Sequence, residues 1–165
     1  MAIRVLIADS SGITRDIIRN HLECGGCQVI AETETVAQTI DLFRTTRPEV
    51  VTLDIWLRGA EGNDALSLFR TIRQESPQTS IVIVSASLSP DDQRIYLREG
   101  ASECIVEPFD SAALGRMWRH LADLYPELKR RDEAHPGLTS PGHRRIDLSS
   151  EPSGVQLRRA ARARN

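Results

Sequence analysis

The sequence has few aromatic side chains and no long apolar run. Aromatic residues make up 4% of the 165 residues, so aliphatic side chains must supply most of a core whose hydrophobic content is 40%. No segment approaches the ~20 apolar residues of a transmembrane helix. The N-terminus also lacks the extended apolar region and cleavage site of a secretory signal. We therefore expect a cytoplasmic protein without a membrane segment.

Cysteine is scarce as well, and the pair Cys24 and Cys27 has the spacing of a redox or metal motif. No second pair completes a zinc site. Reactive pairs of this kind lie at a helix N-terminus, whereas this one follows an amphipathic segment. Gly25 and Gly26 are typical of a helix end and turn. We interpret both cysteines as small buried apolar side chains.

Lysine is almost absent, and charge is unevenly distributed along the chain. The formal net charge is −2, with −6 on residues 1–125 and +4 on residues 126–165, where Lys129 is the only lysine. Residues 135–154 are rich in Pro, Gly and Ser, a composition that cannot bury enough apolar surface to offset its ordering entropy. We predict a folded domain over 1–125 and a flexible basic tail over 126–165. Since the tail has no aromatic residue to stack on bases, we expect no nucleic-acid binding.

Short apolar segments alternate with amphipathic segments along the first 125 residues. Five of them have the length of strands, at 3–8, 27–32, 49–54, 80–85 and 102–106. This alternation predicts an α/β fold with a doubly wound five-stranded parallel sheet, flavodoxin-like strand order 2-1-3-4-5 and helices on both faces.

Local signals also place the helices between these strands. Thr35 with Gln38 is typical of a helix start, and Ser89 followed by Pro90 predicts another. The first helix is expected to bury one face of apolar residues at helical spacing, namely Ile13, Ile17, Ile18 and Leu22.

Two aspartates end neighbouring strands of the predicted sheet. Asp9 follows the first strand and Asp54 ends the third. In this strand order the functional crevice lies at the carboxyl ends of those two strands. The sequence therefore predicts a site with two carboxylates.

Four segments at strand ends carry a family resemblance: VLIADSS, VVTLDIWLRGAEG, IVIVSAS and CIVEPFD. Together they resemble the receiver domain of bacterial two-component response regulators, over about residues 1–125. The resemblance implies a non-enzymatic phosphoprotein that serves as a signalling or phosphorelay module. It also implies a sensor histidine kinase or another signalling protein as partner. Because no helix-turn-helix unit follows, we expect a stand-alone receiver of the chemotaxis type.

The resemblance also implies roles for individual residues. Asp54 matches the phosphoacceptor, and Asp9, Asp54 and the carbonyl of Trp56 match the ligands of Mg²⁺. Ser85 matches the switch hydroxyl at the end of strand four. Cys104 occupies the second switch position, where the family usually has an aromatic residue.

Several positions depart from the family pattern. Ser10 replaces the second acid, Arg58 replaces a proline, and Glu107 replaces the lysine that holds the phosphoryl group. Two unit charges about 4 Å apart interact by roughly 4 kcal/mol at an effective dielectric of ~20. A glutamate beside the phosphoryl group would be repelled by a similar amount, unless its side chain turned to solvent or took a proton. Only Arg15 or Arg58 offers a positive charge in place of the lysine. We expect Mg²⁺ to bind weakly or not at all.

These departures favour an atypical receiver with a degraded phosphorylation site that acts mainly through protein contacts. One alternative is an ordinary phospho-switch phosphorylated at Asp54. Another is a flavodoxin-like cofactor-binding module, which would use Ser10, Ser11 and Gly12 as a phosphate loop, although Asp9 and Asp54 would repel a phosphate.

The surface of helix four, strand five and helix five is where receivers usually dimerise or meet partners. It is equally well explained as an ordinary solvated face. The residues that we place there are Arg94, Tyr96, Arg98, Glu99, Arg116 and Arg119.

Overall fold

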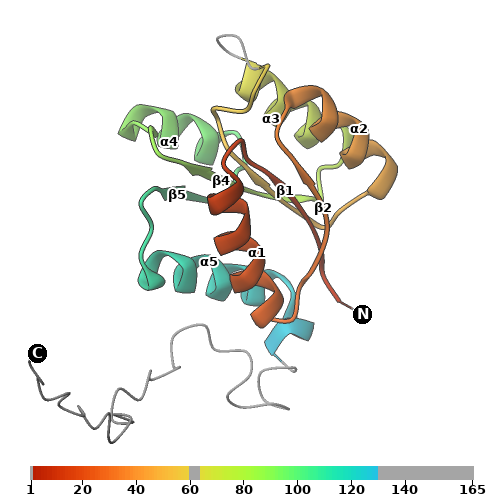
Figure 1. The fold of residues 1–165 in the computed structure, drawn as a ribbon, viewed down its shortest axis with the longest axis vertical. Helices are drawn as coiled ribbons and strands as arrows, with labels where there is room; N and C mark the ends of the chain where they lie inside the picture. Colours follow the sequence, from red (N-terminus) through yellow and green to blue (C-terminus); the bar gives the residue numbers. More distant parts are fainter. Residues whose placement is uncertain (1, 60–63, 130–165) are drawn as a thin grey trace, which may run out of the picture.

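The computed structural model describes residues 2–59 and 64–129, which form a parallel sheet with helices on both faces (Figure 1). The strands are hydrogen-bonded in the order β2-β1-β3-β4-β5, and every neighbouring pair is parallel. The predicted doubly wound sheet and its strand order are confirmed. The strands are β1 (Arg4–Ala8), β2 (Gln28–Thr33), β3 (Val50–Leu53), β4 (Ser80–Ser85) and β5 (Glu103–Val106).

Capping side chains define where the helices begin. Thr35 accepts a hydrogen bond from the backbone N–H of Gln38, and Ser89 forms a reciprocal capping box with Asp92. None of the helices within the described residues is both long and apolar enough to span a membrane. The helices are α1 (Gly12–Cys24), α2 (Val36–Thr46), α3 (Asp64–Glu75), α4 (Pro90–Arg98) and α5 (Ser111–Leu124).

Each strand contributes to two apolar layers because successive side chains point to opposite faces of the sheet. On β1, Val5 and Ile7 pack in the layer that contains α1 and α5. Leu6 and Ala8 pack in the other layer, with Phe43 of α2 and Phe69 of α3. Figure 1 shows α1 and α5 on one side of the sheet and α2, α3 and α4 on the other.

Helix α1 buries a different face from the one that its apolar spacing predicts. Ile18 and Leu22 are buried, but Ile13 and Ile17 are 76% and 43% exposed. Thr14 takes the expected place of Ile13, because Thr14, Ile18 and Leu22 recur every four residues along the stripe that faces the core. The first turn of α1 therefore presents an isoleucine to solvent and a threonine to the interior.

The end of α1 meets α5 at a glycine. Gly25 caps the helix, and a Cβ atom added to it would lie 2.4 Å from the Trp118 ring. Gly26 follows with a φ of 87°, in the region that favours glycine. The expected helix end is confirmed. The expectation that both cysteines are buried holds for Cys27 but is wrong for Cys24, which lies on the surface.

The folded body extends past the boundary expected at residue 125. The Tyr125 hydroxyl donates to the carbonyl oxygen of Glu49 at 2.9 Å and lies 3.0 Å from Oγ of Ser80, at the amino edge of the sheet. Leu128 is 1% exposed and packs in the layer of α1 and α5. The core therefore reaches at least Leu128, and residues 130–165 of the expected tail lie outside the described part of the chain.

Candidate functional site

The carboxyl ends of the strands surround a cavity of about 330 Å³. Asp9 follows β1, Asp54 follows β3, and Glu107 follows β5, so three carboxylates from three strands line one space. The predicted meeting of Asp9 and Asp54 at this edge is observed. The remaining lining residues are Ser10, Ser11, Trp56, Ala86 and Ser87.

Asp54 is held by backbone and hydroxyl donors. Its Oδ1 accepts a hydrogen bond of 3.0 Å from the N–H of Trp56. Burial raises the pKa of Asp54, and hydrogen bonds from Trp56, Ser85, Ile55 and Ser10 oppose that rise. The structure fixes the orientation of Asp54 without placing a positive charge beside it.

Asp9 is the most buried carboxylate of the cavity. It is 2% exposed, and its Oδ1 accepts a 2.7 Å hydrogen bond from the N–H of Ser11. Its Oδ2 is buried without a hydrogen-bond partner in the described part of the chain. Burial raises the pKa of Asp9 to about 6, and the charges of Asp54 and Glu107 add to the rise. The Oδ2 of Asp9 is therefore not hydrogen-bonded within the described residues, while the nearby charge of Arg15 opposes part of the rise in the pKa of Asp9.

Glu107 does not turn away to solvent. It lines the cavity, its N–H donates to the carbonyl oxygen of Ser85 at 2.9 Å, and a cis peptide bond joins it to Pro108. Burial and the charge of Asp54 raise its pKa, and a hydrogen bond from the Thr14 hydroxyl opposes the rise. Thr14 is a residue that the sequence interpretation missed. A polar residue at the first position of the buried stripe of α1 would have been the signal for it.

The two arginines that offered replacement charge point to other acids. Arg15 donates to the Asp9 carbonyl oxygen at 2.7 Å, and it pairs with Glu34 at 2.8 Å and with Glu32 at 3.3 Å. Arg58 pairs with Glu34 at 3.0 Å, and its side chain is 68% exposed. Neither arginine lines the cavity, and no basic side chain among the described residues does so.

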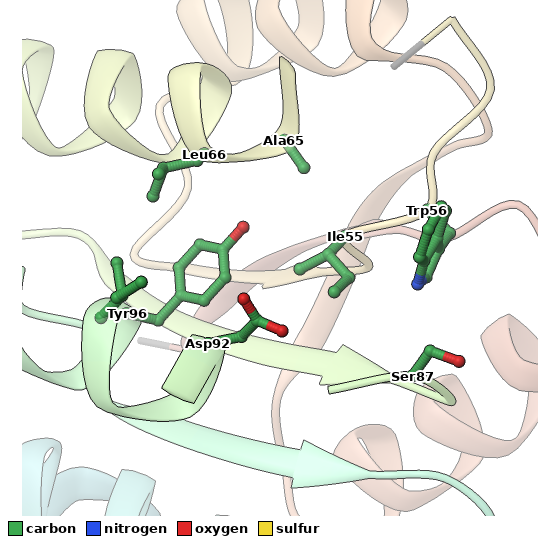
Figure 2. A pocket seen from close by; sticks show the side chains of 8 residues that line it. Ile55, Trp56, Ala65, Leu66, Ser87, Asp92 and Tyr96 are labelled. Atoms are coloured by element: carbon green, nitrogen blue, oxygen red, sulfur yellow. The ribbon is translucent and has the colours of Figure 1, made fainter. Parts of the chain in front are cut away.

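A second cavity of about 230 Å³ lies between α3 and α4 and shares a wall with the first (Figure 2). Trp56 and Ser87 line both spaces. Figure 2 shows these two residues at one end and Tyr96 and Leu66 at the other. The Trp56 side chain is 63% exposed and lines both spaces, so its indole lies at the boundary between the acidic cavity and the groove between α3 and α4.

Tyr96 and Cys104 lie away from the acidic cavity. Tyr96 was expected on the partner surface but is 6% exposed, because its ring packs edge-on against Phe69 with centroids 5.2 Å apart. That placement of Tyr96 at the surface is wrong. Cys104 is half-buried in the same layer, and burial raises the pKa of its thiol to about 11.

The oxygen donors of the cavity are of the kind that Mg²⁺ prefers. The partnerless Oδ2 of Asp9 and the carboxylate of Asp54 suit such an ion. Over residues 2–59 and 64–129, however, no group of three or more His, Cys, Asp or Glu side chains is arranged to hold a metal ion. Glu107 is therefore not placed as a third ligand. The residues present fit a cation held by two carboxylates.

Comparison with known proteins gives a consistent result. The family model described as the response regulator receiver domain matches residues 5–119. The chemotaxis protein CheY of Bacillus subtilis is 32% identical over 111 residues, which cover 67% of this chain and 90% of that protein. The transcriptional regulatory protein CseB of Streptomyces coelicolor is 29% identical over 167 residues, covering 96% of this chain and 67% of that protein.

A solved structure has the same fold. The crystal structure of a response regulator from Thermotoga maritima superimposes with a TM-score of 0.65 at 26% sequence identity. The match covers 76% of this chain and 99% of that one.

Proposed function

The chain belongs to the response regulator receiver domain family of two-component signalling, and from that premise we propose that it is a receiver with a degraded phosphorylation site. It would signal mainly through protein contacts. The observation that carries the proposal is the lining of the cavity, where three carboxylates meet without a basic side chain from the described residues.

Glu107 opposes phosphorylation of Asp54 through its charge. A phosphoryl group on Asp54 would add negative charge to a cavity that Glu107 already lines. At about 4 Å and an effective dielectric of ~20, each pair of unit charges interacts by roughly 4 kcal/mol. The Glu107 carboxylate lines the cavity together with Asp54, so the two charges face one space. Protonation of Glu107, whose pKa is raised, would relieve only part of this penalty.

Receiver domains generally bind Mg²⁺, which neutralises the charge of an incoming phosphoryl group and orients it. In this chain Asp9, Asp54 and the carbonyl of Trp56 would hold the ion. Ser10 lines the cavity with a neutral hydroxyl, so it adds no negative charge toward a cation. We propose weak binding of Mg²⁺ for this reason.

An ordinary phospho-switch remains the second candidate, and the surroundings of Asp54 favour it. Asp54 lines the cavity, and a hydrogen bond from Ser85, the expected switch residue, is among the causes that lower the pKa of Asp54. If phosphorylation still occurs, these two residues would carry it. The flavodoxin-like alternative gains no support, because the cavity beside Ser10 and Ser11 is acidic.

Receiver domains interact with histidine kinases and other signalling proteins. For this chain we propose the face of α4, β5 and α5 as a contact or homodimer surface. Leu97 and Val106 are 48% and 42% exposed on α4 and β5, so the face offers apolar area to a partner. The charged residues that surround it with exposed side chains are Arg94, Arg98, Arg116 and Arg119.

The decisive experiment is incubation with a small phosphodonor and Mg²⁺, followed by intact-mass measurement. We expect little adduct on the unaltered chain and a stable adduct on the Ser10→Asp/Glu107→Lys variant. The adduct should disappear when Asp54→Asn is added. Glu23→Lys, on the exposed end of α1, makes the same charge change as Glu107→Lys and should have no effect. Equal labelling of the unaltered chain and the double variant would instead establish the ordinary phospho-switch.

A further inference from the structure

The acidic cavity is lined by three carboxylates and by no basic side chain of the described residues. Asp9 and Asp54 are 2% and 7% exposed, and Glu107 is directed at the same space. The Oδ2 atom of Asp9 has no hydrogen-bond partner among the described residues, although buried carboxylate oxygens are normally paired. Arg15 and Arg58, the arginines expected to supply charge, pair with Glu32 and Glu34 instead.

From this geometry we propose that the cavity at Asp9, Asp54 and Glu107 binds an arginine guanidinium group supplied by residues 158–164 of the same chain. That segment carries four arginines within seven residues, Arg158, Arg159, Arg162 and Arg164. The inference rests on the proposed function only in requiring that Asp54 carries no phosphoryl group.

A guanidinium group suits this cavity better than an ammonium group does. It is planar, always charged, and offers five N–H donors that match carboxylates two at a time. The carboxylates here come from three different strand ends, so a forked donor can contact more than one of them. The exposed indole of Trp56 borders the same space and offers an aromatic face for a cation.

The length of the chain permits the contact. Tyr125 anchors the end of the described fold to Glu49 and Ser80, at the amino edge of the sheet and opposite the cavity. The longest strands, β2 and β4, have six residues, or about 20 Å at 3.3 Å per residue. A random-coil linker with as many residues as lie between Lys129 and Arg158 would have a typical end-to-end distance of roughly 30 Å. Such a linker gives a tethered group an effective concentration in the millimolar range.

Charge favours the same pairing. Residues 1–125 carry a net charge of −6 and residues 126–165 one of +4. Attraction between the two parts would be screened by salt, since the Debye length falls from about 10 Å at 0.1 M to about 3 Å at 1 M. The bound segment would occupy the carboxylates that Mg²⁺ needs, so arginine and metal should compete.

The test uses the full-length chain in a Trp118→Phe background, where Trp56 is the remaining tryptophan. One variant replaces Arg158, Arg159, Arg162 and Arg164 with Gln. A matched control makes the same replacement at Arg130, Arg131, Arg144 and Arg145, which removes the same charge from nearer positions of the tail. Mg²⁺ titrations are followed by Trp56 fluorescence, and by calorimetry in the Trp118 chain in case the background variant folds poorly.

We expect the first variant to bind Mg²⁺ about 2- to 10-fold more tightly, as a competitor at millimolar effective concentration predicts. The control should not change the midpoint, and adding Glu107→Gln should shrink the difference between tail variants. Equal effects of both replacements, or no effect of either, would overturn the proposal. If the difference in Mg²⁺ affinity disappears on dilution of the protein, the arginine comes from a second copy of the chain, and the intramolecular contact is overturned. Because no phosphodonor is present, this result is independent of whether Asp54 can be phosphorylated.

Discussion

Replacement of Asp9 by Asn should stabilise the protein at neutral pH, because Asp9 is buried beside two other carboxylates. Its folded-state pKa is raised from 3.8 to about 6, so ionised Asp9 disfavours the folded state. At 1.36 kcal/mol per pKa unit, the rise corresponds to roughly 3 kcal/mol as an upper bound. The stability that protonated Asp9 provides is complete below pH 3.8, and it is lost progressively as the pH rises through about 6.

The Asp9→Asn variant should therefore match the unaltered protein near pH 4 and exceed it by about 1–3 kcal/mol at pH 8. Urea unfolding followed by circular dichroism at pH 4, 6 and 8 measures this difference. Asp41→Asn, on the exposed surface of α2, is the matched control and should change stability little at any of these pH values. A variant that is less stable than the unaltered protein at pH 8, or a difference that does not vary with pH, would refute the reasoning.

Two further predictions concern the metal and the packing of α1 on α5. In the Trp118→Phe background, Mg²⁺ should change Trp56 fluorescence only at millimolar or higher concentration, because Ser10 adds no negative charge to the metal site. Saturation at submillimolar Mg²⁺ would contradict weak binding. Gly25→Ala should cost about 1–3 kcal/mol in thermal or urea unfolding, because the new Cβ would lie 2.4 Å from the Trp118 ring. Gly115→Ala is its control: it lies within α5, where the nearest atom would be 3.5 Å away, and should stabilise by about 0.5–1 kcal/mol. Similar effects of the two substitutions would show that α1 and α5 do not approach closely at Gly25.

Local pattern was sufficient to predict the sheet and the positions of the carboxylates. The strands fall within a residue or two of the predicted segments, because apolar runs and capping residues such as Thr35 and Ser89 act through near neighbours in the chain. The placement of Asp9 and Asp54 follows from the strand order alone, since parallel strands bring their carboxyl ends to one edge.

Features that depend on contacts between distant elements were not predictable in the same way. Which stripe of α1 is buried depends on how the helix rotates against the sheet, and this rotation exchanges Ile13 for Thr14. Tyr96 has both apolar and polar character, and the neighbouring Phe69 ring decides its burial. The ion-pair partners of Arg15 and Arg58 could not be predicted for a similar reason. These partners, Glu32 and Glu34, lie on or beside another strand.

The clustering of Asp9, Asp54 and Glu107 also affects how fast charged molecules reach the cavity. Oppositely charged sites accelerate encounters by 10- to 1,000-fold, and added salt removes the gain. A cavity with three like charges should do the reverse, so an anionic small phosphodonor should react faster as ionic strength rises at constant Mg²⁺. A rate that falls with salt would show that positive charge dominates the entrance. The cavity would thus slow the approach of free anions before any of them binds. A partner protein with a positively charged surface would reach the cavity faster.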